Sequence, residues 1–503
     1  MSLILISKIV ITQQPTNAYP DRSEVYTLTT VNSCEIESSW MNLTSTAHLV
    51  FPKNIYVKSS TDKRAWKLQS MYITPPADDG TIAAGTSGNK IADAIDAANN
   101  AVSNALTTAV SGVNSAINKV VNTLTNTNTA ATQTPIFLRG DKITISLGYA
   151  YQPPASSSNP FTSVADQVRT MIDNGVVNSD GYVPVLNPEF EGYITKINPR
   201  MPLEIWCEDN MWLLKQAQCP NMTFPADEKG AQGVLSSLLK SIITPKDPDD
   251  PNYTYITETI VKALKNFKIQ NGFGTSTIPT NIGDFTTQNQ TIAQVLDSWR
   301  NDYKLECFFR GNDLYLSPIV YNPTDFTING QLSSFVYDFQ NNIISDDLTY
   351  LRSDDLRVGI HAYSVYPTKT GDQNITQSVR AEVTIGDTDG ELRTQYFWPP
   401  SNAIQLTQQQ VEAQLTTQAM LYLNKLKYDG WQGSFISFGL PFVRHGQAVT
   451  LKDAVIPERN GGTYLVKSVK VNFSVDGGFR REIGLHFKLN TDSDSLQSYQ
   501  NGL

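Results

Sequence analysis

A long stretch without aromatic residues, 79–134, divides this sequence and limits how the rest can fold. Ala, Thr, Ser, Asn and Gly dominate it, so it lacks the large apolar side chains that fill a core. Runs rich in β-branched residues precede it at Ile6–Thr12, Val25–Thr30 and His48–Val57, and similar sequence resumes at Pro135. Such runs, bounded by Pro, Asn, Asp and Ser clusters, are typical of short strands. We therefore predict one β-domain that is interrupted by a long insertion.

The insertion itself carries a helical pattern. Its apolar residues recur at steps of three, four and four: Ile95, Ala98, Val102, Leu106, Ala109, Val113, Ile117, Val120 and Leu124. A repeat of eleven residues predicts a helix whose apolar stripe is nearly straight or drifts to a right-handed coil. The other face is Asn, Ser and Thr, which are mediocre helix formers, so the helix needs a partner for its stripe. The stripe is a candidate partner-binding surface; packing on its own domain and a disordered loop are the alternatives.

The 503 residues are enough for about three domains. We expect a fold of the α+β class, mainly β, with two strand-rich regions joined by a mixed α/β segment and a helical insertion in the first region; that each region is a β-barrel is what the family resemblance given below implies. Helical periodicity predicts helices at Thr291–Tyr303 and at Thr407–Leu426, and a hairpin follows the first of these. The expected divisions are 1–78 (start of the first barrel), 79–134 (insertion), 135–212 (remainder of the first barrel), 213–325 (mixed segment), 326–490 (second barrel, with a helix near 407–426) and 491–503 (flexible tail).

Composition excludes several classes of function. The formal net charge is -9 and no stretch is strongly basic, which argues against tight binding of nucleic acid. This acidity is ordinary for a soluble protein, and it would also suit a surface past which DNA moves. No apolar run approaches the ~20 residues that span a bilayer. The four cysteines form no CxxC pair, so we expect reduced and mostly buried thiols: Cys34, Cys207, Cys219 and Cys307.

No catalytic, cofactor-binding or metal-binding residues are predicted. The four histidines make no HxH or HExxH arrangement, and no nucleophile elbow, P-loop or GxGxxG fingerprint opens a helix. Carboxylate pairs occur at Glu189 with Glu191 and at Asp346 with Asp347. A glycosidase needs two carboxylates across a sugar, which spacing in sequence alone does not demonstrate. We therefore expect a protein that is not an enzyme.

Two segments carry a resemblance to a known family. The first begins LRGDKITISLGYAY and, after a variable loop, continues FEGYITKINPRMPLEIWCEDNMWLLK. The second is GSFISFGLPFVRHGQAVTLKD, followed by a Gly-Tyr strand and a final amphipathic strand. These segments resemble the baseplate hub proteins of contractile phage tails and related injection systems, including late-control proteins and the hub part of type VI secretion spike proteins. The matching positions are Gly140, Asp141, Gly148, Tyr149, Phe190, Gly192, Ile194, Cys207, Asp209, Trp212, Gly439, Pro441, Gly446, Val449, Gly462, Tyr464 and Val466.

The resemblance implies a structural role in an assembly. It implies a homotrimer, in which two barrels per chain make a ring that adapts a hexameric tail tube to a threefold spike. The implied partners are the tail tube protein, a spike on a separate chain, the tape-measure protein and other baseplate components, with DNA only as passing cargo. The implied location is the virion tail baseplate, after assembly in the host bacterial cytoplasm. The insertion has no counterpart in the family, and its stripe would meet a second copy or another tail component.

Two other functions stay open at this point. A receptor-binding or glycan-binding tail protein would also be rich in strands, and its aromatic residues would form exposed stacking platforms. A hydrolase of cell-wall or capsule polymer would need two carboxylates facing one groove.

Overall fold

The computed structural model describes most of the chain outside the insertion. The described residues are 3–68, 135–151, 183–224, 234–238, 267–270, 285–317, 327–397, 399 and 405–489, with short gaps at 17, 54, 61–64, 201, 220, 236, 304, 329–330, 333–334, 353–354, 371–374 and 457–461. The predicted helical insertion with its apolar stripe and the tail 491–503 lie outside the described residues, so both stay predictions.

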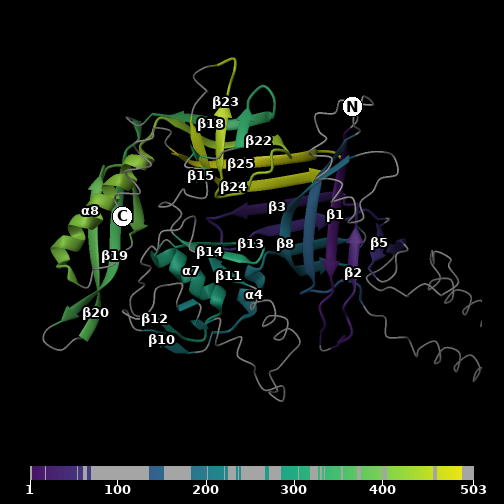
Figure 1. The fold of residues 1–503 in the computed structure, drawn as a ribbon, viewed down its shortest axis with the longest axis horizontal. Helices are drawn as coiled ribbons and strands as arrows, with labels where there is room; N and C mark the ends of the chain where they lie inside the picture. The colour runs from purple at the N-terminus through teal and green to yellow at the C-terminus, as the bar shows by residue number, and fades with distance from the viewer. Residues whose placement is uncertain are drawn as a thin grey trace, which may run out of the picture.

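The first β-domain is an antiparallel sheet, drawn on the right of Figure 1. Its strands run in the order β3-β4-β9-β8-β7-β1-β2-β5-β6. Their bounds are β1 (Leu3–Thr12), β2 (Val25–Leu28), β3 (Ser33–Ser39), β4 (Thr46–Val50), β5 (Ile55–Ser59), β6 (Ala65–Leu68), β7 (Lys142–Tyr151), β8 (Val183–Asn198) and β9 (Glu204–Glu208). Alternate side chains of these strands face one core, as Ile9 and Ile11 of β1 do.

A bent hairpin closes this sheet into a barrel. Only residues 29–32 separate β2 from β3, and the antiparallel pairing along the sheet makes these two strands run in the same direction. β4 and β5 are related in the same way across 51–54. The hairpin thus has two bent arms, one made of β2 and β3 and the other of β4 and β5. On one side of the bend β2 pairs with β1, and on the other side β4 pairs with β9. The two ends of the sheet therefore meet at a corner, and Leu28, Leu49 and Ile143 are fully buried members of the core.

The second barrel is built on the same plan. Its order is β17-β23-β24-β25-β22-β18, and only residues 339–342 separate the two end strands. The bounds are β17 (Phe335–Asp338), β18 (Ile343–Leu351), β22 (Gly430–Phe438), β23 (Ala448–Lys452), β24 (Thr463–Ser474) and β25 (Gly478–Leu489). β3 pairs with β24 over the register Ser33↔Ser474 to Ser39↔Ser468, so the two barrels share one 15-stranded sheet.

A separate unit interrupts the second barrel. β20 (Ile375–Gly386), β19 (Val358–Thr370) and β21 (Glu391–Tyr396) form their own three-stranded sheet, and α8 (Gln408–Leu426) packs on it. The sequence predicted that 326–490 forms one barrel, but β19–β21 and α8 do not belong to it. α8 buries Val411 and Leu415 against the β19–β21 sheet and not against the barrel core. α8 itself lies where periodicity predicted it, and Thr407 starts it with a capping box.

The mixed segment between the barrels builds a second core, to which Tyr193 of β8, Tyr363 of β19 and Tyr396 of β21 also contribute. It contains α4 (Met211–Gln216), α7 (Ile292–Tyr303), β10 (Met222–Phe224), β11 (Lys268–Gln270), β12 (Phe285–Thr287), β13 (Glu306–Arg310) and β14 (Asp313–Ser317), and the short pair β15 (Thr327–Ile328) and β16 (Gln331–Leu332) follows. The apolar face of α7 packs on this small core, with Leu296 and Trp299 fully buried. In Figure 1 the segment lies below the point where the barrels meet.

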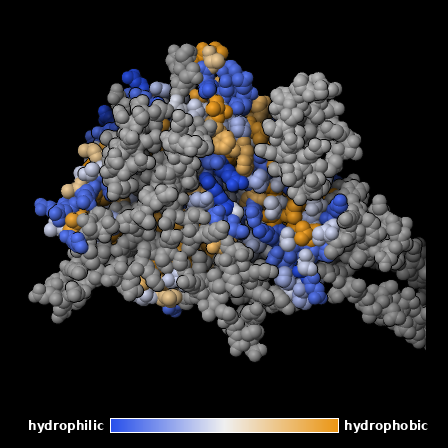
Figure 2. Space-filling model, viewed as in Figure 1, coloured by the Kyte–Doolittle hydropathy of each residue, from blue (hydrophilic) through white to orange (hydrophobic). Residues whose placement is uncertain are grey.

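The predicted mainly β fold of the α+β class is confirmed. Each of the four cysteines is buried, and burial raises the pKa of Cys219 to about 11. Where Figure 2 colours the surface, hydrophilic and hydrophobic residues lie side by side. Among the helices that the structure describes, none combines the length and apolar character needed to cross a membrane.

Candidate functional site: the contact between the two barrels

The β3–β24 ladder, which we call the seam, makes the backbone contact between the barrels. Side chains reinforce its pairing from the β3 side: Trp40 Nε1 donates to Val466 O at 3.0 Å, and Ser39 Oγ donates to Lys467 O at 3.0 Å. On the exposed face, Lys470 pairs with Glu35 and Glu37. The seam therefore joins two closed barrels along an edge that would otherwise invite aggregation.

The two segments that carry the family resemblance meet beside the seam. The Tyr149 hydroxyl donates to Phe479 O and accepts from Gly439 N, both at 3.2 Å, and the Tyr149 and Phe479 rings lie 5.4 Å apart. A Cβ at Gly439 would overlap the Phe479 ring, so only glycine fits this place without movement. Positions that lie far apart in sequence thus form one contact between the barrels.

In the first segment, Gly140 and Asp141 make a turn that a buried ion pair fixes. Gly140 has φ +94°, a conformation that favours glycine. Both carboxylate oxygens of Asp141 accept from the Arg22 guanidinium, at 2.8 and 2.7 Å, and both side chains are 1% exposed. Asp141 also accepts from the backbone N–H groups of Gln14 and Leu138, which satisfies its remaining lone pairs.

The other positions of the first segment also support the barrel wall. At Gly148 and Gly192 a Cβ would overlap the backbone of a neighbouring strand, while Phe190 and Cys207 lie in the core. Asp209 accepts from the backbone N–H of Ser45 at 2.8 Å and of Met211 at 3.0 Å. It thereby ties the first residue of α4 to the loop before β4. Burial raises the pKa of Asp209 to about 7.

In the second segment, the matching positions shape the turns of the second barrel. Pro441 accepts through its carbonyl from the Tyr337 hydroxyl at 3.0 Å. Gly446 has φ +76°, and its N–H donates to Val466 O at 2.7 Å. The Tyr464 hydroxyl accepts from Trp431 N at 3.0 Å.

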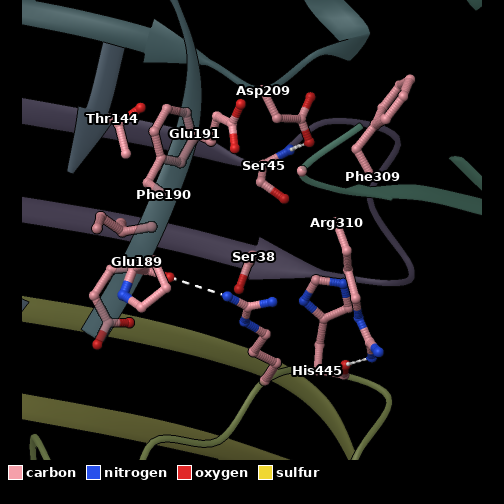
Figure 3. Close-up of a pocket in the computed structure, with 14 residues that line it drawn as sticks. Ser38, Ser45, Thr144, Glu189, Phe190, Glu191, Asp209, Phe309, Arg310 and His445 are labelled. Atoms are coloured by element: carbon pink, nitrogen blue, oxygen red, sulfur yellow. Dashed lines mark hydrogen bonds between the residues drawn. The ribbon is translucent and has the colours of Figure 1, made fainter. Parts of the chain in front are cut away.

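A cavity of about 290 Å³ lies where both barrels and the mixed segment come together (Figure 3). Glu189 and Glu191 of β8 line it from the first barrel, Arg310 of β13 from the mixed segment, and Arg444 and His445 from the second barrel. Arg310 Nη2 donates to His445 O at 2.8 Å, which joins the mixed segment to the second barrel. Arg444 Nη2 donates to Pro188 O at 3.1 Å, which joins the two barrels.

The carboxylates of this cavity are already engaged. Glu189 Oε1 accepts from Arg481 Nη2 at 2.5 Å, and these side chains are 2% and 1% exposed. Burial raises the pKa of Glu189, and the nearby Arg481 guanidinium opposes the rise. Glu191 pairs with Lys142 at 2.6 Å. The Glu189 and Glu191 pair noted in the sequence is therefore held by basic partners and is not arranged as a free acid and base across a groove.

His445 is the least satisfied group at the cavity. Its side chain is 4% exposed and packs edge-on against Phe308 at 4.8 Å. Neither ring nitrogen has a hydrogen-bond partner within the described residues. Burial lowers the pKa of His445 to about 3, and Arg310 and Arg444 add to the effect. A neutral imidazole is therefore buried here.

Several buried residues of the two barrels carry no signal in the sequence. Arg22, Arg481, Phe479 and His445 match no motif, and their partners are distant; the Arg481–Glu189 pair, for example, spans 292 positions. Asp346 and Asp347, the other carboxylate pair, lie on the exposed strand β18. The predicted partner-binding stripe of the insertion lies outside the described residues. Across the ranges that the structure describes, no group of three or more His, Cys, Asp or Glu side chains is placed to hold a metal ion.

Comparisons with known proteins give structures but no sequence family. No family model matches the chain, and no curated protein matches it. The tail protein from Neisseria meningitidis MC58 is 9% identical, with 96% of each chain covered and a TM-score of 0.43. The 43 kDa tail protein of prophage MuSo2 from Shewanella oneidensis is 8% identical, with 95% of this chain and 97% of that chain covered and a TM-score of 0.42.

A third similar structure is the Francisella PdpA–VgrG complex. It is 8% identical, covers 97% of this chain and 53% of that chain, and has a TM-score of 0.40. The first two of these three structures are described as tail proteins. With TM-scores below 0.5, these likenesses carry no conclusion about function.

Proposed function

We propose that this chain is a structural baseplate hub of a phage tail or a related injection machine. Three copies associate into a ring of six barrels that adapts a hexameric tail tube to a threefold central spike. The ring encloses the channel through which DNA or other cargo passes, and it acts without catalysis. Its partners are the tube protein, a spike on a separate chain and the tape-measure protein, and its place is the virion.

The observation that carries the proposal is the seam. A ring of six barrels from three chains needs two barrels per chain, joined edge to edge in a fixed relation. The ladder between β3 and β24, backed by the buried Arg481–Glu189 pair, supplies such a join within one chain. The engaged carboxylates of the cavity favour this role over the hydrolase.

The insertion has a place in this proposal. Its apolar stripe, centred on Leu106 and Val113, would contact a second copy or another tail component. The two barrels, the second interrupted by β19–β21 and α8, are the units of the proposed ring.

The test is assembly and symmetry. Mass photometry of the full chain at micromolar concentration should give a trimer, and electron microscopy should give a threefold ring with a central channel. Purified tube protein should bind this ring. A chain that stays monomeric, or binds host cells or polysaccharide and not tube protein, would overturn the proposal in favour of a receptor-binding role.

A further inference from the structure

The two barrels correspond strand by strand. Their orders are β3-β4-β9-β8-β7 and β18-β22-β25-β24-β23, and in each barrel the first strand is one half of a bent strand. The match extends to single hydrogen bonds. In the first barrel Gly140 N donates to Ile194 O, and Ile194 N donates to Asp141 O. In the second barrel Gly446, Val466 and Gln447 repeat both bonds.

The correspondence makes β8 of the first barrel equivalent to β24. On β24 one edge is filled by β25, while the other edge pairs first with β23 and then, from Ser468 to Ser474, with β3. On β8 the equivalent edge pairs with β7 as far as Tyr193. Beyond Ile194, no strand among the described residues pairs with this edge of β8. The first barrel therefore carries the same open edge that β3 occupies on the second barrel.

β18 is the strand that corresponds to β3. It lies at one end of the shared sheet, with β22 on one side and no described strand on the other. Most of its residues are exposed, including Ile344 at 44% and Tyr350 at 49%. An exposed strand edge with large apolar side chains is a surface that usually needs a partner.

We infer that β18 of one copy pairs with the end of β8 in the next copy, repeating the seam between chains. This inference rests on the proposed ring and names the strands that would join it. The two edges are different surfaces, so the contact is head-to-tail, and it makes a ring when the rotation from one copy to the next is the one-third turn of the proposed trimer.

Carrying over the register of the seam fixes which residues meet. The registers of the ladders β4–β9 and β22–β25 align the two barrels residue by residue. In this alignment Glu35 of β3 corresponds to Asp347 of β18, and Asn472 of β24 corresponds to Arg200, just after β8. Glu35 and Asn472 are opposite each other in the seam, so Asp347 would face Arg200 of the next copy. By the same register, Thr349 would face Asn198 and Tyr350 would face Ile197. Pro199 has no N–H to donate, so the ladder would weaken there.

Charge agrees with this register. In the seam an acidic strand, β3, meets Lys470 of β24. At the proposed contact, acidic β18 would meet the basic end of β8, which carries Lys196 and Arg200. Neither Asp347 nor Arg200 has an ion-pair partner in the part of the chain that the structure describes. Opposite charges placed on the two edges favour the head-to-tail contact and disfavour contacts of like edges.

The test reverses one charge at a time and then both. Arg200→Glu and Asp347→Lys should each raise the concentration needed for half-assembly by roughly tenfold, because each places like charges together. The double variant R200E/D347K should assemble as the wild type does. Mixed with a mass-tagged wild type, the double variant should form separate trimers in native mass spectrometry, since each mixed contact would pair like charges. Lys58→Glu, an exposed change on β5, is the control and should leave assembly unchanged.

A cross-link gives a second measurement. Thr349→Cys with Asn198→Cys should yield a disulfide-linked trimer on oxidation, whereas Thr349→Cys with Lys58→Cys should not. If the wild type is a trimer but the single reversals assemble normally, or the double variant mixes freely with it, this inference fails and the proposed ring stands on other edges. If the wild type is monomeric at micromolar concentration, the proposed ring and this inference fall together.

Discussion

The barrels meet in two contacts that are built differently. In the seam, two backbones pair over the length of β3, and the charged side chains stay at least one-third exposed: Lys470 36%, Glu35 45% and Glu37 56%. At the cavity, the barrels meet through side chains that are almost wholly buried, with Arg481 1% and Glu189 2% exposed.

This difference decides how each contact depends on sequence. Every residue except proline can donate and accept in a ladder, so the seam needs a suitable pattern more than particular side chains. A buried charge needs one particular partner, because water cannot replace it. Substitutions at the cavity should therefore be costly, and substitutions on the exposed face of the seam should not.

The largest effect is expected for Arg481→Met. The change leaves the Glu189 carboxylate buried without its cation and removes the hydrogen bonds from Arg481 to Gly439 O and Val443 O. We expect a loss of ~3–5 kcal/mol in the free energy of unfolding at pH 7, measured by urea denaturation at fixed protein concentration. In the variant the Arg481 guanidinium no longer opposes the effect of burial, so the folded-state pKa of Glu189 rises further. Its carboxylate then takes up a proton as the pH falls. The loss should thus be smaller at pH 5 than at pH 7.

The matched control is the exposed pair of Arg393 and Glu391, whose side chains are 38% and 62% exposed. Arg393→Met should change the free energy of unfolding by less than about 1 kcal/mol. The double variant E189Q/R481M should recover some of the loss, since it no longer buries a lone charge. Equal losses for Arg393→Met and Arg481→Met would contradict the distinction between the two contacts.

Gly439→Ala should have the next largest effect. The new methyl group would overlap the Phe479 ring, and moving that ring disturbs the contact with Tyr149. Overpacking of this kind costs about 1–3 kcal/mol, which a thermal melt would detect. Gly477→Ala, on the exposed turn before β25, is the control: its methyl group would meet only the Ser474 hydroxyl, which can rotate away at the expense of its hydrogen bond from Gly477 N, so the loss should be smaller than for Gly439→Ala. Phe479→Leu combined with Gly439→Ala should restore some of the stability, and no recovery would argue against the overlap.

His445→Phe tests the unsatisfied imidazole. Burial holds the folded-state pKa of His445 at about 3, below its ordinary 6.5, so the wild type loses stability as the pH falls from 6.5 towards 3. This loss amounts to at most about 1.4 kcal/mol per pH unit. His445→Phe lacks this loss of stability. As the pH is lowered from 8 to 5, the melting temperature of the variant should therefore rise relative to that of the wild type. Asp209, with its pKa raised to about 7, acts in the opposite direction, so Asp209→Asn should steepen the acid loss. Parallel melting curves for wild type and His445→Phe would show that the imidazole does not carry this dependence.

Local patterns predicted much of the fold. Apolar spacing predicted helices at Thr291–Tyr303 and Thr407–Leu426, and the structure has them at Ile292–Tyr303 and Gln408–Leu426. The reason is that a helix face is set by residues three and four apart, which a short window of sequence contains. Gly140 and Gly446 of the family motif lie at turns for an equally local reason, the positive φ of their own backbone.

Contacts between distant segments could not be predicted in this way. Arg22 and Asp141 are 119 positions apart, and no periodicity relates them. The placement of Val358–Leu426 as a unit outside the second barrel was missed for the same reason. Its strands have ordinary strand sequences, and only pairing partners, which are not encoded locally, decide which sheet a strand joins. His445 could not be singled out either, because its burial depends on three segments that meet.

The smallest effect is expected at the seam, for Lys470→Gln. The Lys470 ammonium lies between Glu35 and Glu37 on the exposed face, where water and salt weaken the attraction. Since the β3–β24 ladder does not need this side chain, we expect a loss of less than about 1 kcal/mol, which should vanish in about 1 M salt. Lys470→Glu places three carboxylates together and should lose somewhat more, also in a salt-dependent way. Urea denaturation of both variants at low and high salt measures this. A loss at Lys470 as large as that of Arg481→Met, and insensitive to salt, would mean that the seam depends on buried charge after all and that the two contacts are of one kind.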